Sequence, residues 1–169
     1  MHLNNKIMEL TTMTASTILS MFMSMSEVPT TDNFVYNAEM EGDKITAITT
    51  YTSDAIEQLY NKQKDVYVYD QVGRVVSKEQ MVWSESERQW LPSRKWSYSY
   101  RQLSTTVDYA RWDAERQRYG ATEQRLVYEG MADCLLSVHE YQLDVQGQMQ
   151  LTDQFLMMHS GTRHLLAMR

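Results

Sequence analysis

The sequence predicts an all-β fold, an antiparallel meander of about ten strands. Polar and apolar residues alternate along several stretches, and period-two alternation is the pattern of a strand with one buried face. The chain of 169 residues contains 11 Tyr and 4 Trp, and these side chains favour strands. The connections between the alternating stretches are short, whereas parallel neighbours need crossovers of about a dozen residues or more. We therefore expect antiparallel pairing throughout.

Aromatic residues recur with a fixed period. Trp83, Trp112 and Tyr141 follow one another at intervals of 29 residues, and the same interval separates Trp90 from Tyr119. A fixed period is the sign of a repeated supersecondary unit, and this length suits a hairpin with its connection. We expect two or three copies, folded into one domain.

The first hairpin is expected around a tight turn at residues 41–44. Residues 34–40 alternate before the turn, and the alternation resumes after it. Residues 53–64 fit two descriptions, a helix of one or two turns or a strand with a long loop. The second strand is expected to place four residues on one face: Ile45, Ala47, Thr49 and Tyr51.

Two later turns share the order Asp-x-x-Gly, at residues 70–74 and 144–148. An Asp at the first position accepts hydrogen bonds from the nearby backbone, and Gly supplies the positive φ. All six glycines fall between the predicted strands. The remaining strands are expected at residues 66–69, 75–83, 95–101, 105–112, 124–128, 135–143, 149–158 and 163–168.

About ten strands approach the upper limit for one open sheet. Strand twist has a fixed hand and accumulates across such a sheet. We therefore expect a strongly twisted and partly closed single sheet with at most one short helix, and a β-sandwich is the alternative.

Residues 1–26 have the order of a secretory signal. Lys6 is followed by an apolar and hydroxyl-rich stretch at residues 8–25, and small residues precede an acidic, proline-containing stretch. A transmembrane helix is not expected, because a span needs about 20 mostly apolar residues. Residues 27–33 are interpreted as a linker and residues 34–169 as a single β domain. We predict an exported protein (periplasmic, cell-surface or secreted), and a cytoplasmic protein with an N-terminal tail is the alternative.

The formal net charge of −6, without a local cluster of Lys and Arg, argues against nucleic acid and anionic membranes as partners. The single cysteine, Cys134, excludes an intrachain disulfide and is expected to be a small buried residue. His159 and His164 flank a predicted turn, with no further Cys or His nearby to complete a tetrahedral zinc site. No metal and no cofactor are expected.

No catalytic residue is assigned from the sequence. The acid pairs Glu85/Glu87 and Asp113/Glu115 lie in predicted turns, where carboxylates are solvated, whereas glycosidase carboxylates face each other across a cleft. The sequence contains neither a Gly-x-Ser-x-Gly nucleophile motif nor a Gly-rich phosphate loop. A hydrolase with acidic residues in a groove of the sheet is the alternative function.

Aromatic residues supply the candidate ligand-binding site. The candidate residues, named below, share the sheet with Tyr67 and Tyr69 on a neighbouring strand. Together these rings form either the core of the sheet or an exposed platform that stacks on sugar rings or on a partner's apolar surface. The predicted function is an exported binding module that engages a glycan, an envelope component or a protein through this face or through a sheet edge. Edge pairing into a homo-oligomer is also open. The candidate binding residues are Trp83, Trp96, Tyr98 and Tyr100.

A series of aromatic, turn and charged residues begins with a Tyr-x-Tyr-Asp-x-x-Gly-Arg-Val run. It consists of Tyr67, Tyr69, Asp70, Gly73, Arg74, Val75, Lys78, Glu79, Trp83, Trp90, Pro92, Tyr98, Tyr100, Tyr109, Trp112, Asp113 and Tyr119. The series resembles a small secreted family restricted to Bacteroidetes, domain of unknown function 3836. The resemblance implies an export signal, an all-β fold and no established activity. The Tyr-Asp-x-x-Gly-Arg piece is also similar to the YD repeats of bacterial wall-associated and toxin-shell proteins.

Overall fold

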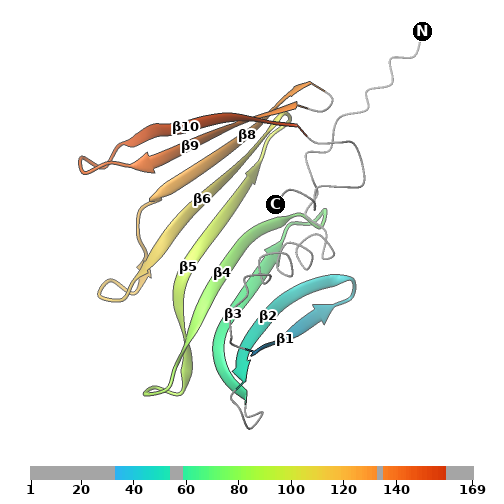
Figure 1. The fold of residues 1–169 in the computed structure, drawn as a ribbon, viewed down its shortest axis with the longest axis vertical. Helices are drawn as coiled ribbons and strands as arrows, with labels where there is room; N and C mark the ends of the chain where they lie inside the picture. Colours follow the sequence, from blue (N-terminus) through green and yellow to red (C-terminus); the bar gives the residue numbers. More distant parts are fainter. Residues whose placement is uncertain (1–32, 54–58, 133–134, 159–169) are drawn as a thin grey trace.

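A computed structural model describes residues 33–53, 59–132 and 135–158, which form a single open sheet (Figure 1). The antiparallel meander is confirmed, and the sandwich is not adopted. The sheet is not closed into a barrel, and the described residues contain no helix. The strands are β1 (Asn33–Glu41), β2 (Lys44–Ser53), β3 (Leu59–Tyr69), β4 (Val75–Ser84), β5 (Gln89–Tyr100), β6 (Ser104–Asp113), β7 (Arg118–Tyr119), β8 (Gln124–Ala132), β9 (Leu135–Leu143) and β10 (Met149–Met158).

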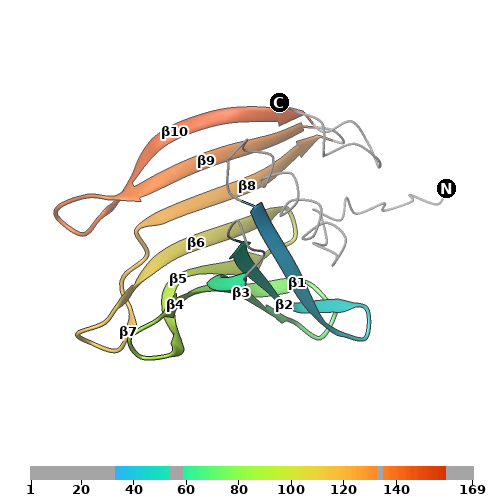
Figure 2. The same cartoon turned by 60° about the horizontal axis from the view of Figure 1, so that its bottom comes forward.

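The strands follow one another across the sheet in chain order. The short strand β7 pairs with β6 and stands off this path, so that β6 pairs with β8. In Figure 1, β8, β9 and β10 lie at the upper end and β1, β2 and β3 at the lower end, and the strand direction turns progressively between them. Figure 2 shows that the sheet is also bent. The accumulated right-handed twist of the strands accounts for this shape.

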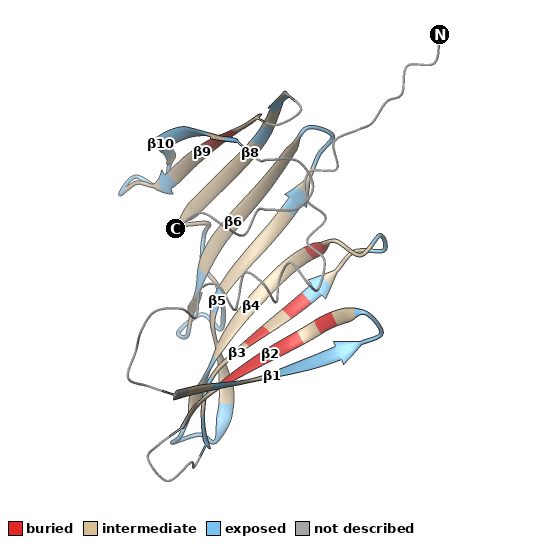
Figure 3. Cartoon of the chain, turned by 45° about the vertical axis from the view of Figure 1, so that its right-hand side comes forward, coloured by how far each residue is buried: buried red, intermediate tan, exposed pale blue. Residues whose placement is uncertain are grey.

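One face of β2–β5 carries the hydrophobic core, and we call it the core face. Figure 3 shows that the buried segments concentrate on β2 and β3. Four residues with exposed fractions of 7% or less form the cluster, and two tyrosines pack against it. The cluster contains Ile45, Ile48, Tyr67 and Val75, and the tyrosines are Tyr69 and Tyr98.

The opposite face of β4, β5, β6 and β8 is polar, and we call it the polar face. Glu79 and Lys95 are opposite each other in the β4–β5 ladder, with 2.8 Å between Oε1 and Nζ. Arg125 in β8 donates two hydrogen bonds, of 2.6 and 3.0 Å, to the carboxylate of Asp108 in β6. Both pairs are partly exposed, so this face is solvated where they lie.

A β-bulge in β2 changes the predicted face of one core residue. Glu39 is opposite Ala47 and Met40 is opposite Ile45, which leaves Thr46 as an extra residue. An extra residue interrupts the alternation of side chains along the strand. Ile45 therefore joins Ile48 in the core cluster. Strict alternation predicts that Ile45 shares a face with Ala47, and this prediction is wrong.

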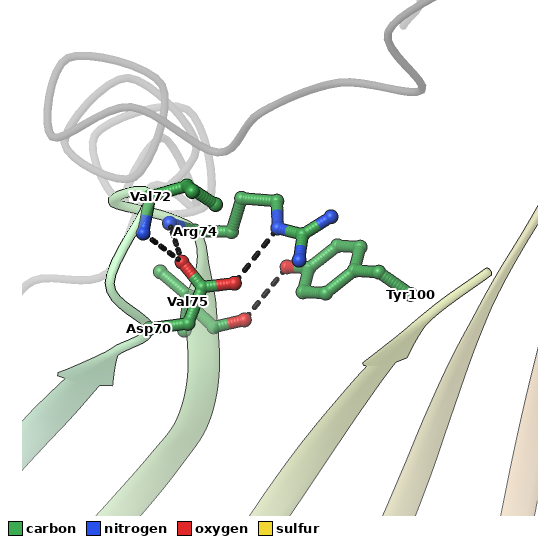
Figure 4. A network of polar contacts seen from close by, with 5 residues as sticks. All are labelled: Asp70, Val72, Arg74, Val75 and Tyr100. Carbon is green, nitrogen blue, oxygen red and sulfur yellow. Dashed lines mark hydrogen bonds and ion pairs between the residues drawn. The ribbon is translucent and has the colours of Figure 1, made fainter. Parts of the chain in front are cut away.

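The two Asp-x-x-Gly turns have the same hydrogen bonds from backbone N–H groups to Asp Oδ1. Asp70 Oδ1 accepts hydrogen bonds from the N–H groups of Val72 (3.0 Å) and Arg74 (2.9 Å), and Oδ2 accepts one from Arg74 Nε (2.8 Å) (Figure 4). Asp144 Oδ1 likewise accepts from Gln146 (2.8 Å) and Gln148 (2.9 Å). The predicted turn chemistry is confirmed at both positions.

Some strand bounds differ from the predicted ones. β3 begins at Leu59, so the described part of residues 53–64 is strand and not helix. β5 begins at Gln89, well before position 95, because Trp90 pairs with Trp83 and a register shift at Ser93 hides the alternation. Gly130 lies inside β8, next to a register shift, and not between strands. Other predictions fall outside the described residues: the segment 1–26, the predicted linker 27–33 apart from Asn33, which begins β1, Cys134, His159, His164 and the strand at 163–168.

Candidate functional site

The 29-residue period corresponds to two equivalent hairpin ends. Trp83 is opposite Trp90 in the β4–β5 ladder, with ring centroids 5.2 Å apart and planes at 67°. Trp112 is opposite Tyr119 in the β6–β7 ladder, with centroids 5.0 Å apart and planes at 75°. Both pairs are edge-to-face, an arrangement that aromatic rings favour. The repeat found in the sequence is therefore a repeat of structure.

The equivalence extends into the turns that follow these strands. Ser84 Oγ accepts a hydrogen bond from the N–H of Glu87 (3.2 Å), and Asp113 Oδ1 accepts one from the N–H of Arg116 (3.0 Å). A residue with positive φ follows in each turn, Arg88 at 53° and Gln117 at 50°. In the second turn, each of these residues lies 29 positions after the equivalent residue of the first turn.

The third marker of the period, Tyr141, is built differently. It lies in β9 opposite Arg125 and Leu151, and the turn that follows it is the Asp144 turn. Two copies of the hairpin end are present in the described residues, and not three.

Both aromatic pairs lie on the polar face. Trp83 is four residues from Glu79 along β4, and alternation gives residues at even spacing the same face. Trp112 is two residues from Ala110, which is opposite Lys95 in the ladder. Lys95 Nζ also lies 5.3 Å from the centroid of the Tyr119 ring.

The two hairpin ends lie at the same end of the sheet (Figures 1 and 2). All four rings there are partly exposed. They follow one another across four neighbouring strands, β4, β5, β6 and β7. We call this surface the aromatic patch, and it consists of Trp83, Trp90, Trp112 and Tyr119.

The register separates the four residues proposed from the sequence. Trp96 is opposite Lys78, which is opposite Tyr67, so Trp96, Tyr98 and Tyr100 share the core face. Trp83 lies five residues after Lys78 and therefore points to the polar face. The predicted platform of all four rings does not form as one surface.

The three rings on the core face already have partners within the chain. The Trp96 ring lies between Lys78 Nζ (4.9 Å to the ring centroid) and the Tyr109 ring (5.4 Å). Tyr98 packs on the core cluster, and burial raises its pKa to about 12. Tyr100 donates a 2.6 Å hydrogen bond to the carbonyl of Val75 (Figure 4), with the Arg74 guanidinium 4.5 Å from its ring centroid. These contacts are typical of structural aromatic residues.

Charges around the aromatic patch nearly balance. Glu79 pairs with Lys95, and Arg116 pairs with Asp113 at 2.8 Å. The Tyr119 hydroxyl is buried and has no hydrogen-bond partner among the described residues, and burial raises its pKa to about 12. The patch is therefore an apolar, aromatic surface with a polar and almost neutral border.

Ser137, His139 and Glu129 on β8 and β9 have the side-chain types of a Ser-His-acid catalytic triad but not its accessibility. Ser137 Oγ lies 3.2 Å from His139 Nε2, and His139 Nδ1 lies 3.9 Å from Glu129 Oε2. Ser137 is only 4% exposed, so its hydroxyl is closed to a substrate carbonyl, which a nucleophile must reach. The group therefore stabilises the β8–β9 pair and does not support the hydrolase alternative.

The acid pairs Glu85/Glu87 and Asp113/Glu115 lie at the hairpin ends, as predicted. In the part of the chain that the structure describes, no three His, Cys, Asp or Glu side chains are placed to hold a metal ion. Within the same residues there is no helix long and apolar enough to cross a membrane.

The outer strand β10 is the most exposed long strand of the sheet. Leu151, Leu156 and Met158 have exposed fractions of 52%, 61% and 74%, and Asp153 is the single charged residue of the strand. Native edge strands usually carry charges or proline that discourage pairing with another chain. β10 ends at Met158, and residues 159–169 lie outside the described residues.

Comparison with known proteins finds similar solved structures. A protein of unknown function from Bacteroides fragilis NCTC 9343 is 21% identical, with 75% of this chain and 94% of that chain covered and a TM-score of 0.68. A DUF3836 family protein from Bacteroides vulgatus ATCC 8482 is 26% identical, with 52% and 89% covered and a TM-score of 0.50. Another from Parabacteroides distasonis ATCC 8503 is 18% identical, with 58% and 91% covered and a TM-score of 0.52.

A family described as a family of unknown function (DUF3836) matches residues 2–130. The match includes both hairpin ends of the aromatic patch and stops before β9 and β10. No curated protein matches the chain.

Proposed function

Because the chain belongs to the family of unknown function DUF3836, whose description names no activity, we propose a function from its geometry: an exported binding module that engages its ligand through the aromatic patch. The fold supplies a continuous hydrogen-bonded sheet, and the two hairpin ends supply the contact surface. The chemistry is recognition, without a covalent step.

The observation that carries the proposal is the position of the aromatic patch. Its rings lie on the polar face, while the core cluster of Ile48, Tyr67 and Val75 lies on the other face. The rest of the polar face is held by ion pairs such as Glu79–Lys95. These rings lie apart from the core cluster, and apolar patches on a solvated face mark interaction sites.

The core-face rings support the proposal by contrast. Trp96 and Tyr100 contact Lys78 and Arg74 and lie on the face that carries the core cluster, so packing within the chain accounts for both rings. The Trp83–Trp90 and Trp112–Tyr119 rings lie away from that cluster and are partly exposed.

Export rests on the sequence of residues 1–26, which has the order of a secretory signal. The test is to express the full chain in a Bacteroides host, fractionate the cells, and measure the mass of the recovered protein. We expect a shortened protein outside the cytoplasm. An uncleaved chain that stays in the cytoplasm would refute the export part of the proposal.

The binding part is tested with Trp83→Ala and Trp112→Ala, assayed against a panel of immobilised polysaccharides, peptidoglycan and envelope proteins. Val68→Ala is a matched control, because Val68 is 50% exposed on the same face and lies away from the patch. We expect both Trp variants to lose binding while their melting curves stay close to that of the parent chain.

The opposite result would show that the patch is structural. Truncating a fully buried Trp costs roughly 3–5 kcal/mol. A loss of that size in both variants, together with unchanged binding of every panel member, would overturn the proposed function. Circular dichroism of each variant separates the two cases.

A further inference from the structure

From the duplication of the aromatic pairs, we infer that the ligand of the aromatic patch is a linear, uncharged polysaccharide that contacts both hairpin ends at once. This inference rests on the proposed function, since it names the ligand class of the same surface. It depends on three features: the repetition of the site, its chemistry and the order of its rings.

Repetition is the first feature. The two ends have the same ring arrangement, with centroids 5.2 and 5.0 Å apart, and the same turn hydrogen bond at Ser84 and Asp113. Two equivalent contact points on one rigid sheet suit a ligand that presents the same group more than once. A polysaccharide does so by its nature.

The chemistry of the border is the second feature. Aromatic rings offer flat apolar surface, and hydrogen-bonding side chains beside them fix the orientation of a ligand. Ser84, Gln89 and Gln117 carry hydroxyl and amide groups at the two turns, and each also has a hydrogen bond within its own turn. Sugar rings, which have apolar C–H faces and hydroxyl edges, match both parts.

Charge decides between neutral and ionic glycans. Glu79 pairs with Lys95 and Asp113 pairs with Arg116 beside the rings. The two turns carry four acids (Glu85, Glu87, Asp113 and Glu115) and three bases (Arg88, Arg116 and Arg118), so no large surplus of one sign attracts a polyion. The net charge of −6 for the whole chain also disfavours an anionic polymer, since like charges repel. An uncharged glycan has no such penalty.

Ring order is the third feature. The rings occupy successive strands from β4 to β7, and neighbouring strands are about 4.8 Å apart. Trp83 and Trp112 are two strands apart, which separates them by about 10 Å across the sheet, and they differ by two residues in register, which adds about 7 Å along the strands. A chain of sugar residues that crosses the strands reaches both pairs, whereas a single monosaccharide reaches one.

The test is a titration of the full chain with neutral cello-, xylo-, malto- and manno-oligosaccharides of increasing length, followed by calorimetry. We expect affinity to rise with length until both pairs are spanned and then to level off. Trp83→Ala and Trp112→Ala should each abolish the gain with length and weaken binding of the longest ligand by roughly tenfold. Val68→Ala should leave the whole series unchanged.

Several outcomes would overturn the inference. They are the absence of binding by all four series, equal affinity for short and long members, and a preference for polygalacturonate, hyaluronan or a protein over the neutral series. If Trp83→Ala and Trp112→Ala weaken binding of such an ionic glycan or protein, the proposed function stands and this inference fails. If neither variant alters the binding of any probe, both fail.

Discussion

The β3–β4 and β9–β10 hairpins close with the same turn but differ in the burial of their strands. Asp70 and Asp144 each accept hydrogen bonds from the second and fourth residues after them, and Gly73 and Gly147 have φ values of 86° and 79°. Around the first turn, Tyr67 and Val75 belong to the hydrophobic core.

Around the second turn, β10 is exposed along most of its length. β3 has a neighbour on each side and a cluster of apolar side chains on one face, while β10 is paired only with β9 among the described residues. The turn is therefore a local property of a few residues, and burial is a property of position in the sheet. Four changes break or sharpen this comparison, and we take them from the largest expected effect to the smallest.

The largest difference is expected between Ile48→Ala and Leu156→Ala. Ile48 is 1% exposed, and Leu156 is 61% exposed. Loss of buried methyl groups should lower the free energy of unfolding by about 2–5 kcal/mol for Ile48→Ala, while Leu156→Ala should change it by less than about 0.5 kcal/mol. Urea denaturation of both variants measures the difference. Equal destabilisation would mean that β10 is packed against a surface of its own.

Removal of the cation that pairs with a buried carboxylate in the β3–β4 hairpin should also lower the free energy of unfolding strongly. Asp65 is 1% exposed, and its carboxylate lies 3.6 Å from Lys78 Nζ. Lys78→Met leaves this carboxylate without its cation, a change that costs about 3 kcal/mol when a buried pair is broken. Denaturation at neutral pH checks the value. The double variant Asp65→Asn/Lys78→Met should recover part of the loss, and no recovery would contradict the pairing.

Alkaline pH should destabilise the protein through the tyrosines of the core cluster and those packed on it. Burial raises the pKa of Tyr98 from its ordinary value of 10.0 to about 12, and it raises that of Tyr67 further. A raised folded-state pKa gives a contribution that is complete below pH 10 and is lost as the pH rises toward 12. Melting temperatures measured between these pH values should fall, and Tyr98→Phe should flatten the decline. A decline of the same slope in Tyr98→Phe would exclude this tyrosine as its source.

The smallest effect concerns acid pH and the two turns themselves. The backbone N–H of Arg74 lowers the pKa of Asp70, and that of Gln148 lowers the pKa of Asp144. A lowered folded-state pKa gives stability that is present above the ordinary value of 3.8 and is lost as the pH falls through the lowered value.

Asp70→Asn and Asp144→Asn should each reduce this acid sensitivity. The change should be larger for Asp70, because Arg74 also forms an ion pair with it. Melting temperature followed from neutral to acid pH measures both variants. An equal change in the two would show that the ion pair adds nothing to the turn.

Much of the fold could be predicted from the sequence, because turns and alternation are local. The strands at 135–143 and 149–158 have the predicted bounds, and both Asp turns form. The bulge at Thr46 and the register shift at Ser93 could not be predicted, since an extra residue in a ladder shows only when the partner strand is known.

The candidate site was harder to predict, for the same reason. The 29-residue period brings Trp83, Trp90, Trp112 and Tyr119 into one series, and it was the signal for the aromatic patch. The face of Trp83 relative to Trp96, however, depends on the pairing of Lys78 with Trp96. A single change of register would place these rings on one face, so the sequence alone could not separate them.

The period has a further consequence for the length of the sheet. One unit, from Trp83 to Trp112, spans a turn and two strands, β5 and β6. Two strands restore the original chain direction, so a whole unit can be inserted or removed without reversing any remaining pair. The four buried residues of the core cluster lie on β2–β4, outside this unit, and Tyr98 of β5 packs against them. The width of the sheet can therefore change by whole units, provided that a tyrosine equivalent to Tyr98 still covers the cluster.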